Sequence, residues 1–213
     1  MMIKIERIEK DRIKKDIYWI YLEDGRKISL YSDLVVKHNL KRDKEISEKE
    51  LKEWQEEDEA LKSFSAALNY LSFRPRSKKE MENYLAKKGF SRAAIESALN
   101  KLENYRYIDD FTFASSWTKS RLNNKQMSKR MIAYELYHKG IDRDVIDEVL
   151  EMVDEEEEER AALALAEKYF KRYQGLEKKQ MLYKISQALA RRGFDWGLIQ
   201  KVCNKVIDSG DEE

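Results

Sequence analysis

The stretch "LAKKGFSRAAIESAL" at residues 85–99 returns twice, in altered form, further along the chain. It becomes "LYHKGIDRDVIDEVL" at residues 136–150 and "LARRGFDWGLIQKVC" at residues 189–203. When the three glycines are aligned, apolar residues coincide four positions before the glycine and one, six and ten positions after it. The glycines are 51 and 53 residues apart. The chain therefore repeats a unit of about fifty residues, a period typical of repeat architectures.

Each repeat carries the pattern of a helix end followed by a helix start. A glycine supplies the left-handed conformation that ends a helix, and the next apolar residue then contacts the residue five positions earlier, as Phe90 would contact Leu85. Residues suited to N-capping follow two positions after each glycine: Ser91, Asp142 and Asp195. We therefore expect two helices around each glycine, preceded by a third helix at residues 60–73, 109–122 and 156–174.

The first forty residues follow a different pattern. The segment "DIYWIYL" at residues 16–22 is rich in aromatic and β-branched residues, and "RKISLY" follows at residues 26–31. The Asp24-Gly25 pair between them is a strong signal for a β-hairpin turn. We expect two or three strands, which must pack on a helix or a partner because so small a sheet is marginally stable in water.

A long helix is predicted after these strands. Ser47 and Glu50 form a capping-box signature, in which each side chain satisfies a backbone N–H at a helix start. Residues 51–73 contain no Gly or Pro, and Pro75 closes the stretch, so it forms one long helix or two in close succession. Its second half, residues 60–71, is the more apolar, and we expect it to be the buried part.

The composition favours a helical protein. The 213 residues are 42% hydrophobic and 39% charged, with one Pro and seven Gly. Because three helices suffice to close a small core, we predict a mainly α fold: three tandem three-helix bundles in an elongated, curved rod behind a small N-terminal β-hairpin segment. The expected boundaries are 1–46 for the N-terminal segment, 47–108 for the long helix and first repeat, 109–154 for the second repeat and 155–213 for the third.

Several classes of protein are disfavoured. A single Cys203 excludes an intramolecular disulfide, and its alignment with Leu99 and Leu150 predicts a buried hydrophobe. No apolar run approaches the ~20 residues of a membrane helix, and Glu6 and Glu9 stand where a signal peptide is apolar. We expect a monomer in the cytoplasm. Because the P-loop, G-x-S-x-G and H-E-x-x-H motifs are missing from the sequence, we expect neither an enzyme nor a metal or cofactor.

Charge is segregated along the chain, although the net charge is only +1. Residues 160–207 carry eleven Lys and Arg against three Asp and Glu, whereas residues 151–159 carry seven acids and no base. Such segregation indicates charged partners or docking between modules. The acidic run at residues 154–159 has three explanations: it mimics phosphate, it docks on the basic third repeat, or it solvates a helix start, where acids suit the dipole.

Residues 77–121 and the helix end that follows them resemble the RecX family of regulatory proteins. The resemblance rests on Lys88-Gly89-Phe90, Tyr107-Ile108-Asp109-Asp110, Phe113-Ala114, Arg121 and Lys139-Gly140-Ile141. It implies a modulator of the RecA recombinase in homologous recombination, DNA repair and the SOS response. It further implies binding in the helical groove of the RecA–DNA filament, with inhibition of its ATPase, its extension and strand exchange. Two features depart from the family pattern: "NNKQMSKR" at residues 123–130 lacks a Gly that many relatives have, and the N-terminal hairpin is an addition not found throughout the family.

The candidate partner-binding residues are all basic. Between Ala114 and Tyr134 every charged residue is positive, which suits the phosphates or the acidic side chains of a filament. A second cluster lies in "RPRSKK" at residues 74–79, where two lysines fall in the first turn of a helix and oppose its dipole. A third pair ends a helix, where cations are favourable even without a partner. The candidates are Arg74, Arg76, Lys78, Lys79, Lys119, Arg121, Lys125, Lys129, Arg130, Arg191 and Arg192.

Alternatives to filament binding stay open at this point. The stripe after Ala114 also fits an ordinary solvated helix pair, and the same cations suit direct binding of DNA without RecA. Trp117 suits either stacking on bases or a place in the core. Under the filament hypothesis, replacing Arg121 and Lys129 by alanine weakens inhibition and leaves the fold intact. His138 is expected to be exposed and without a metal.

Overall fold

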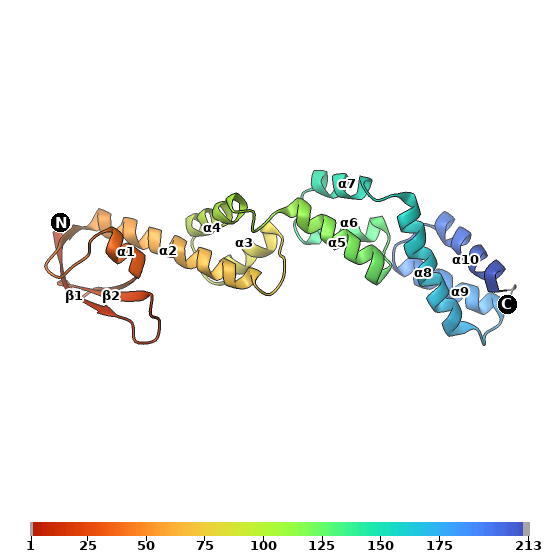
Figure 1. The fold of residues 1–213 in the computed structure, drawn as a ribbon, viewed down its shortest axis with the longest axis horizontal. Helices are drawn as coiled ribbons and strands as arrows, with labels where there is room; N and C mark the ends of the chain where they lie inside the picture. The colour runs from red at the N-terminus through yellow and green to blue at the C-terminus, as the bar shows by residue number, and fades with distance from the viewer. Residues whose placement is uncertain (1, 211–213) are drawn as a thin grey trace. The chain divides into compact units, whose positions relative to one another are not determined.

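A computed structural model describes residues 2–210 and divides them into two compact units. The first unit comprises residues 2–75 and 81–107, and the second comprises residues 76–80 and 108–210. Figure 1 shows strands at the start of the chain and helices through the rest. The prediction of a mainly α fold with three tandem three-helix bundles and a small N-terminal β segment is confirmed.

The N-terminal segment is an antiparallel sheet of four strands, where two or three were expected. The strands are β1 (Met2–Lys10), β2 (Ile17–Leu22), β3 (Lys27–Tyr31) and β4 (Glu45–Ser47), in the order β3-β2-β1-β4. The predicted turn joins β2 to β3, with Gly25 at φ 85° and the Asp24 carboxylate accepting the Arg26 N–H at 3.0 Å. Three residues are too few for an alternating pattern, so β4 becomes recognisable only through its pairing with β1.

Two helices cover one face of this sheet: α1 (Ser32–Lys37) and α2 (Glu48–Leu71). The capping box is confirmed, because Glu50 N–H donates to Ser47 Oγ at 3.2 Å and Ser47 N–H donates to Glu50 Oε2 at 2.8 Å. The expectation that only the second half of the long helix is buried is wrong. Leu51 and Trp54, both in its first half, lie in the core beneath the sheet.

The second half of α2 forms the first bundle with α3 (Lys78–Lys87) and α4 (Arg92–Asn104). Met81, Leu85 and Leu102 are fully buried in it. The predicted glycine cap is present, since Gly89 has φ 87° and Phe90 N–H reaches Leu85 O at 3.4 Å. Both features are repeated at the glycines of the second and third bundles.

The second bundle consists of α5 (Asp110–Lys125), α6 (Lys129–His138) and α7 (Arg143–Glu151), and the third of α8 (Glu155–Tyr173), α9 (Lys178–Arg191) and α10 (Trp196–Gly210). Two of the predicted N-caps, Ser91 and Asp195, accept a backbone N–H, whereas the Asp142 side chain makes no capping hydrogen bond. One continuous hydrophobic core unites the two bundles. The bundles are thus separate in sequence and joined in packing.

Within residues 2–210, no helix combines the length and the apolar character needed to cross a membrane. The predicted burial of Cys203 is confirmed, and this burial raises the pKa of its thiol.

Candidate partner-binding surface

Two buried serines connect the middle helices of successive repeats. Ser77, before α3, donates its hydroxyl to Lys139 O at 2.7 Å, and Ser128, before α6, donates its N–H to Arg192 O at 3.0 Å. Each carbonyl lies at the C-terminal end of the middle helix of the next repeat. We call these contacts the first joint (residues 76–80 with 139–140) and the second joint (residues 128–131 with 192–193). Both joints lie within the second unit.

The glycines of the second and third repeats are needed for close approach as well as for helix capping. A Cβ on Gly140 would lie 2.3 Å from Lys79 Cβ, and a Cβ on Gly193 would lie 2.5 Å from Ser128 Oγ. A Cβ on Gly89 would meet no described atom within 4 Å. The first repeat has no repeat before it, so Gly89 is needed only for its left-handed backbone conformation.

An acidic residue from the next repeat completes each joint. Asp110 Oδ1 accepts the Lys78 N–H, and Glu158 Oε1 accepts the Lys129 N–H, both at 2.8 Å. These carboxylates satisfy backbone donors in the first turn of α3 and α6, where negative charge is favourable. The sequence shows an acidic residue at the start of α5 and of α8, but the backbone N–H that each one binds lies about thirty residues earlier in the chain.

The joints also change the electrostatic setting of the cations in these first turns. Lys78, Lys79 and Lys129 oppose the dipole of their own helix, yet the C-terminal carbonyls of another helix face that turn and carry the opposite partial charge. In the first joint, Glu80 and Lys139 add a part-buried ion pair at 3.0 Å. Contacts within the protein thus offset the unfavourable interaction of these cations with their own helix dipole, and no partner protein is needed to explain them.

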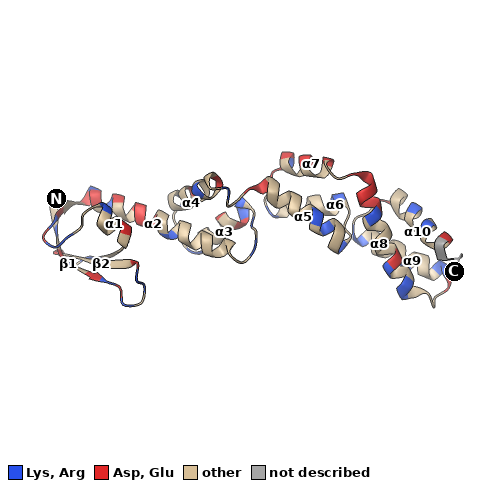
Figure 2. Cartoon of the chain, viewed as in Figure 1, with Lys and Arg blue, Asp and Glu red and all other residues tan. Residues whose placement is uncertain are grey.

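The second joint brings together basic residues from distant parts of the sequence. The bond from Ser128 N–H to Arg192 O places Arg191 and Arg192 beside the start of α6, which carries Lys129 and Arg130. Arg130 and Arg191 are exposed, and Arg192 is half-buried. Lys129 points inward, because its Nζ donates to Val153 O. Figure 2 shows these basic segments on α6 and α9, with acidic residues at the start of α8.

Arg121 is part of a packed cluster rather than a free cation. Its Nε lies 2.6 Å from Glu135 Oε2, and its guanidinium lies 3.8 Å from the centre of the Trp117 ring. Trp117 Nε1 donates to the same carboxylate at 2.8 Å, and Lys139 Nζ lies 4.1 Å from the ring centre. Trp117 thus packs between α5 and α6 with cations on its ring. Since Arg121 and Lys129 both hold intramolecular partners, we no longer expect their replacement to leave the fold undisturbed.

The remaining candidates differ in exposure. Lys119 and Lys125 on α5 are exposed, as is Arg74 in the loop before α3, where its Nη1 donates to Pro75 O at 3.0 Å. Arg76 is half-buried, and Lys78 and Lys79 are exposed at the start of α3. The cations of the candidate surface that point outward on α5, α6 and α9 are therefore Lys119, Lys125, Arg130 and Arg191.

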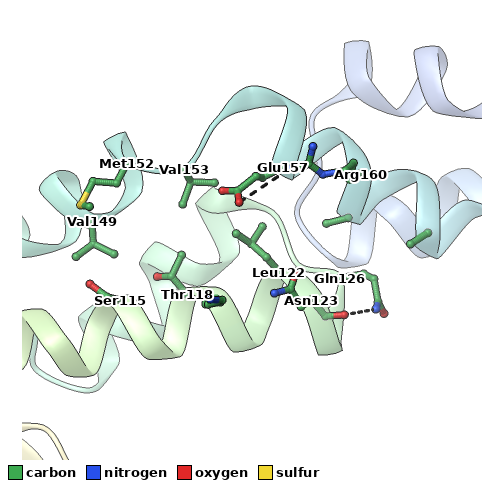
Figure 3. A pocket seen from close by; sticks show the side chains of 13 residues that line it. Ser115, Thr118, Leu122, Asn123, Gln126, Val149, Met152, Val153, Glu157 and Arg160 are labelled. Atoms are coloured by element: carbon green, nitrogen blue, oxygen red, sulfur yellow. Dashed lines mark hydrogen bonds and ion pairs between the residues drawn. The ribbon is translucent and has the colours of Figure 1, made fainter.

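A groove of about 440 Å³ between α5, α7 and α8 adjoins Lys119. In Figure 3, Ser115 and Thr118 rise from α5 toward Val149 and Val153, and their buried hydroxyls find no hydrogen-bond partner among the described residues. Exposed Met152 also lines this groove. Sequence reasoning missed it because its walls come from three helices.

Exposed aromatic residues on α6 were also missed. Tyr134 and Tyr137 are 60% and 56% exposed, and the Tyr134 ring packs edge-on against His138 with centroids 4.2 Å apart. The predicted exposure of His138 is confirmed. The sequence pattern did not single out these two tyrosines, and only their position on the outer side of α6 shows that they are exposed.

The acidic run is bound to the protein itself: Glu156 and Glu157 pair with Arg160 on the same helix, and two further residues reach other helices. Besides the contact of Glu158 with α6, Glu159 pairs with Lys201 and Lys205 of α10 at 2.6 and 2.5 Å. These hydrogen bonds hold the pKa of Glu159 below its ordinary value. The run thus docks in part on the third repeat, as one of the three explanations proposed. Among residues 2–210, no group of three or more potential ligands is placed to hold a metal ion.

Comparisons with known proteins agree with this repeat structure. Family models of RecX match three segments: the first three-helix domain at residues 64–102, the second at 109–150 and the third at 155–203. "Regulatory protein RecX" of Clostridioides difficile (strain 630) is 33% identical over 204 residues, which is 96% of each chain. The protein of the same name from Bacillus subtilis (strain 168) is 31% identical over 98% of this chain and 79% of its own length.

Solved structures give the same result. A crystal structure of regulatory protein RecX superimposes with a TM-score of 0.72 and 26% identity, covering 95% of this chain and 99% of that one. RecX from Lactobacillus salivarius superimposes with a TM-score of 0.63 and 29% identity, covering 70% and 97%. Sequence and structure therefore agree along nearly the whole length, and the chain belongs to the RecX family of regulatory proteins.

Proposed function

We propose that this chain regulates the RecA recombinase by binding the RecA–DNA filament in its helical groove and restraining its ATPase, its extension and strand exchange. The observation that carries the proposal is the match of all three helical domains to RecX regulatory proteins. Because its target works on chromosomal DNA, the proposed site of action is the cytoplasm.

The chemistry of binding is electrostatic and needs no catalytic group. A filament groove exposes DNA phosphates and acidic side chains, and the second and third bundles present Lys119, Lys125, Arg130 and Arg191. Arginine suits such contacts because its guanidinium pairs with phosphate or carboxylate through two hydrogen bonds. A protein that binds one state of the filament more tightly than another shifts the population toward that state. Regulation then follows from binding alone.

The test is the DNA-dependent ATPase of preformed RecA filaments, titrated with this protein at less than one copy per RecA. We expect inhibition well below saturation. The variant Arg130→Glu with Arg191→Glu reverses the two exposed cations at the second joint and should weaken inhibition at least tenfold. The matched control is Lys49→Glu with Lys52→Glu on α2, which makes the same change of charge on exposed residues of the first unit.

Equal loss in both variants would assign the effect to net charge rather than to this surface. The alternative of direct DNA binding through the helical faces is separated by omitting RecA. Binding that neutralises phosphates falls steeply with salt and needs no recombinase. Tight, salt-sensitive binding to DNA together with an unaffected ATPase would overturn the proposal in favour of that alternative.

A further inference from the structure

The sheet at the start of the chain has two different faces. Its inner face carries Ile5, Ile20, Leu22 and Leu30, which form the core beneath α1 and α2. Side chains alternate along a strand, so the residues between them point the other way. The outer face therefore carries Trp19 and Tyr21, both half-buried, at its centre on β2.

Cations from the neighbouring strands flank these two rings. Arg7 on β1 and Lys27 on β3 are both register partners of Tyr21, so the three residues form a row across the sheet. The Arg7 guanidinium lies 4.1 Å from the Tyr21 ring centre, and Lys27 Nζ lies 3.9 Å from that of Trp19 and 4.9 Å from that of Tyr21. Two aromatic rings and two cations thus share one face with Glu9 of β1, which is the register partner of Trp19 and pairs with Arg7 at 3.2 Å.

Trp19 is held in place at the end of this face. Its Nε1 donates to Asp11 Oδ2 at 2.8 Å, and the other oxygen of Asp11 accepts the N–H groups of Ile13 and Lys14. Residues two apart on a strand are separated by roughly 7 Å. Trp19 and Tyr21 therefore offer two ring surfaces side by side along one strand, and a hydrogen bond fixes the Trp19 ring.

A basic loop extends beyond Trp19. Residues 11–16 join β1 to β2, and Arg12, Lys14 and Lys15 in this loop are all exposed. Ile13 at its tip is 90% exposed. With Lys27 and Arg7, these residues surround the two aromatic rings with cations that outnumber the neighbouring acids Glu9, Asp11 and Asp16.

We propose that this outer face is a binding platform for single-stranded nucleic acid. Two successive bases stack on Trp19 and Tyr21, while phosphates pair with Lys27, Arg7 and the loop cations. Stacking on aromatic side chains beside a positive groove is how sequence-tolerant single-strand binding works. Flexible Lys27 and Arg7 leave the rings when bases arrive and move to the phosphates.

The two rings favour nucleic acid over an acidic peptide. Carboxylates need only the cations, whereas flat bases also use the paired ring surfaces. A duplex is disfavoured because its bases already stack on one another. This activity goes beyond the regulation of RecA, since neither the rings nor the loop requires a filament.

The experiment measures binding of the full-length protein to a fluorescently labelled oligo-dT of twelve nucleotides, in the absence of RecA. The variant Trp19→Val with Tyr21→Thr keeps residues suited to a strand and should lose roughly tenfold or more in affinity, as expected for loss of base stacking. The matched control is Trp196→Ala, which removes an exposed tryptophan from α10. The rescue variant Trp19→Phe with Tyr21→Phe retains both rings and should keep most of the affinity.

An abasic oligonucleotide of equal length and charge should bind at least tenfold more weakly than oligo-dT. Comparing the affinities for oligo-dT and for oligo-U of equal length shows whether DNA or RNA is preferred. Oligo-dT and its abasic form binding equally would overturn the proposal, as would an unchanged affinity in the Trp19→Val, Tyr21→Thr variant. Polyglutamate displacing oligo-dT from the wild type but not from this variant would mean that the face takes an acidic peptide. The thermal unfolding of each variant is followed in parallel. The rescue variant shows whether a loss of affinity comes from removal of the aromatic rings or from unfolding of the sheet.

Discussion

At the scale of single residues, one residue type performs two physical tasks in this chain. Gly89, Gly140 and Gly193 all have positive φ and all end a middle helix. Gly140 and Gly193 additionally face a side chain of the preceding repeat, at distances that leave no room for a Cβ. The same capping pattern therefore hides different tolerances to substitution.

Gly89→Ala and Gly140→Ala should separate these two tasks. Both changes place a Cβ in the left-handed region, which costs roughly 1–2 kcal/mol. Gly140→Ala also forces Lys79 away, which adds roughly 1–3 kcal/mol. Urea unfolding followed by circular dichroism measures the difference. Equal losses of stability in the two variants would mean that the first joint is not closed in solution.

At the scale of helices, α5 and α6 are fastened together by Trp117, Arg121 and Glu135. The two contacts to Glu135 are short, and both charged side chains are largely shielded from water. Sequence reasoning placed Arg121 on an exposed stripe because its neighbours in sequence are basic. The partner that removes it from that stripe stands on the next helix, fourteen residues away.

Arg121→Ala should lower the free energy of unfolding by roughly 1–2 kcal/mol, because Glu135 loses a charged hydrogen-bond partner. Lys125→Ala on the same helix removes an exposed cation and should change stability by less than about 0.5 kcal/mol. Chemical denaturation of the two variants beside the wild type gives the comparison. A stability of Arg121→Ala equal to that of Lys125→Ala would contradict the structural role of Arg121.

At the scale of the whole molecule, the repeats of the sequence and the cooperative parts of the structure do not coincide. The first unit contains the sheet and its helices with a hydrophobic core of their own, whereas the second and third bundles share one core. Ile132 and Leu136 of the second bundle belong to the same cluster as Leu165 and Ile185 of the third. We therefore expect these two bundles to depend on each other for stability.

Fragments test this dependence. Residues 1–107 should fold with a cooperative thermal transition, because they contain the whole first unit. Residues 108–154 alone should remain largely unfolded, since they leave the buried faces of the second bundle exposed to water. Residues 108–210 should recover a cooperative transition by circular dichroism. A fully folded second bundle in isolation would contradict the shared core.

Local sequence patterns were enough to predict the repeats, the glycine caps, the capping box at Ser47, the β2–β3 hairpin and the resemblance to RecX. These features depend on residues within about five positions of one another, or on a pattern that recurs along the chain, so they can be recognised without coordinates. The tertiary structure alone decided that Ser77 meets Lys139, that Ser128 meets Arg192, that Arg121 and Lys129 turn inward, and that Trp19 and Tyr21 share a face with Arg7 and Lys27. Each of those outcomes depends on packing between elements distant in sequence, where the surroundings of a charge, and not its residue type, decide whether it binds its own protein or points outward to a partner.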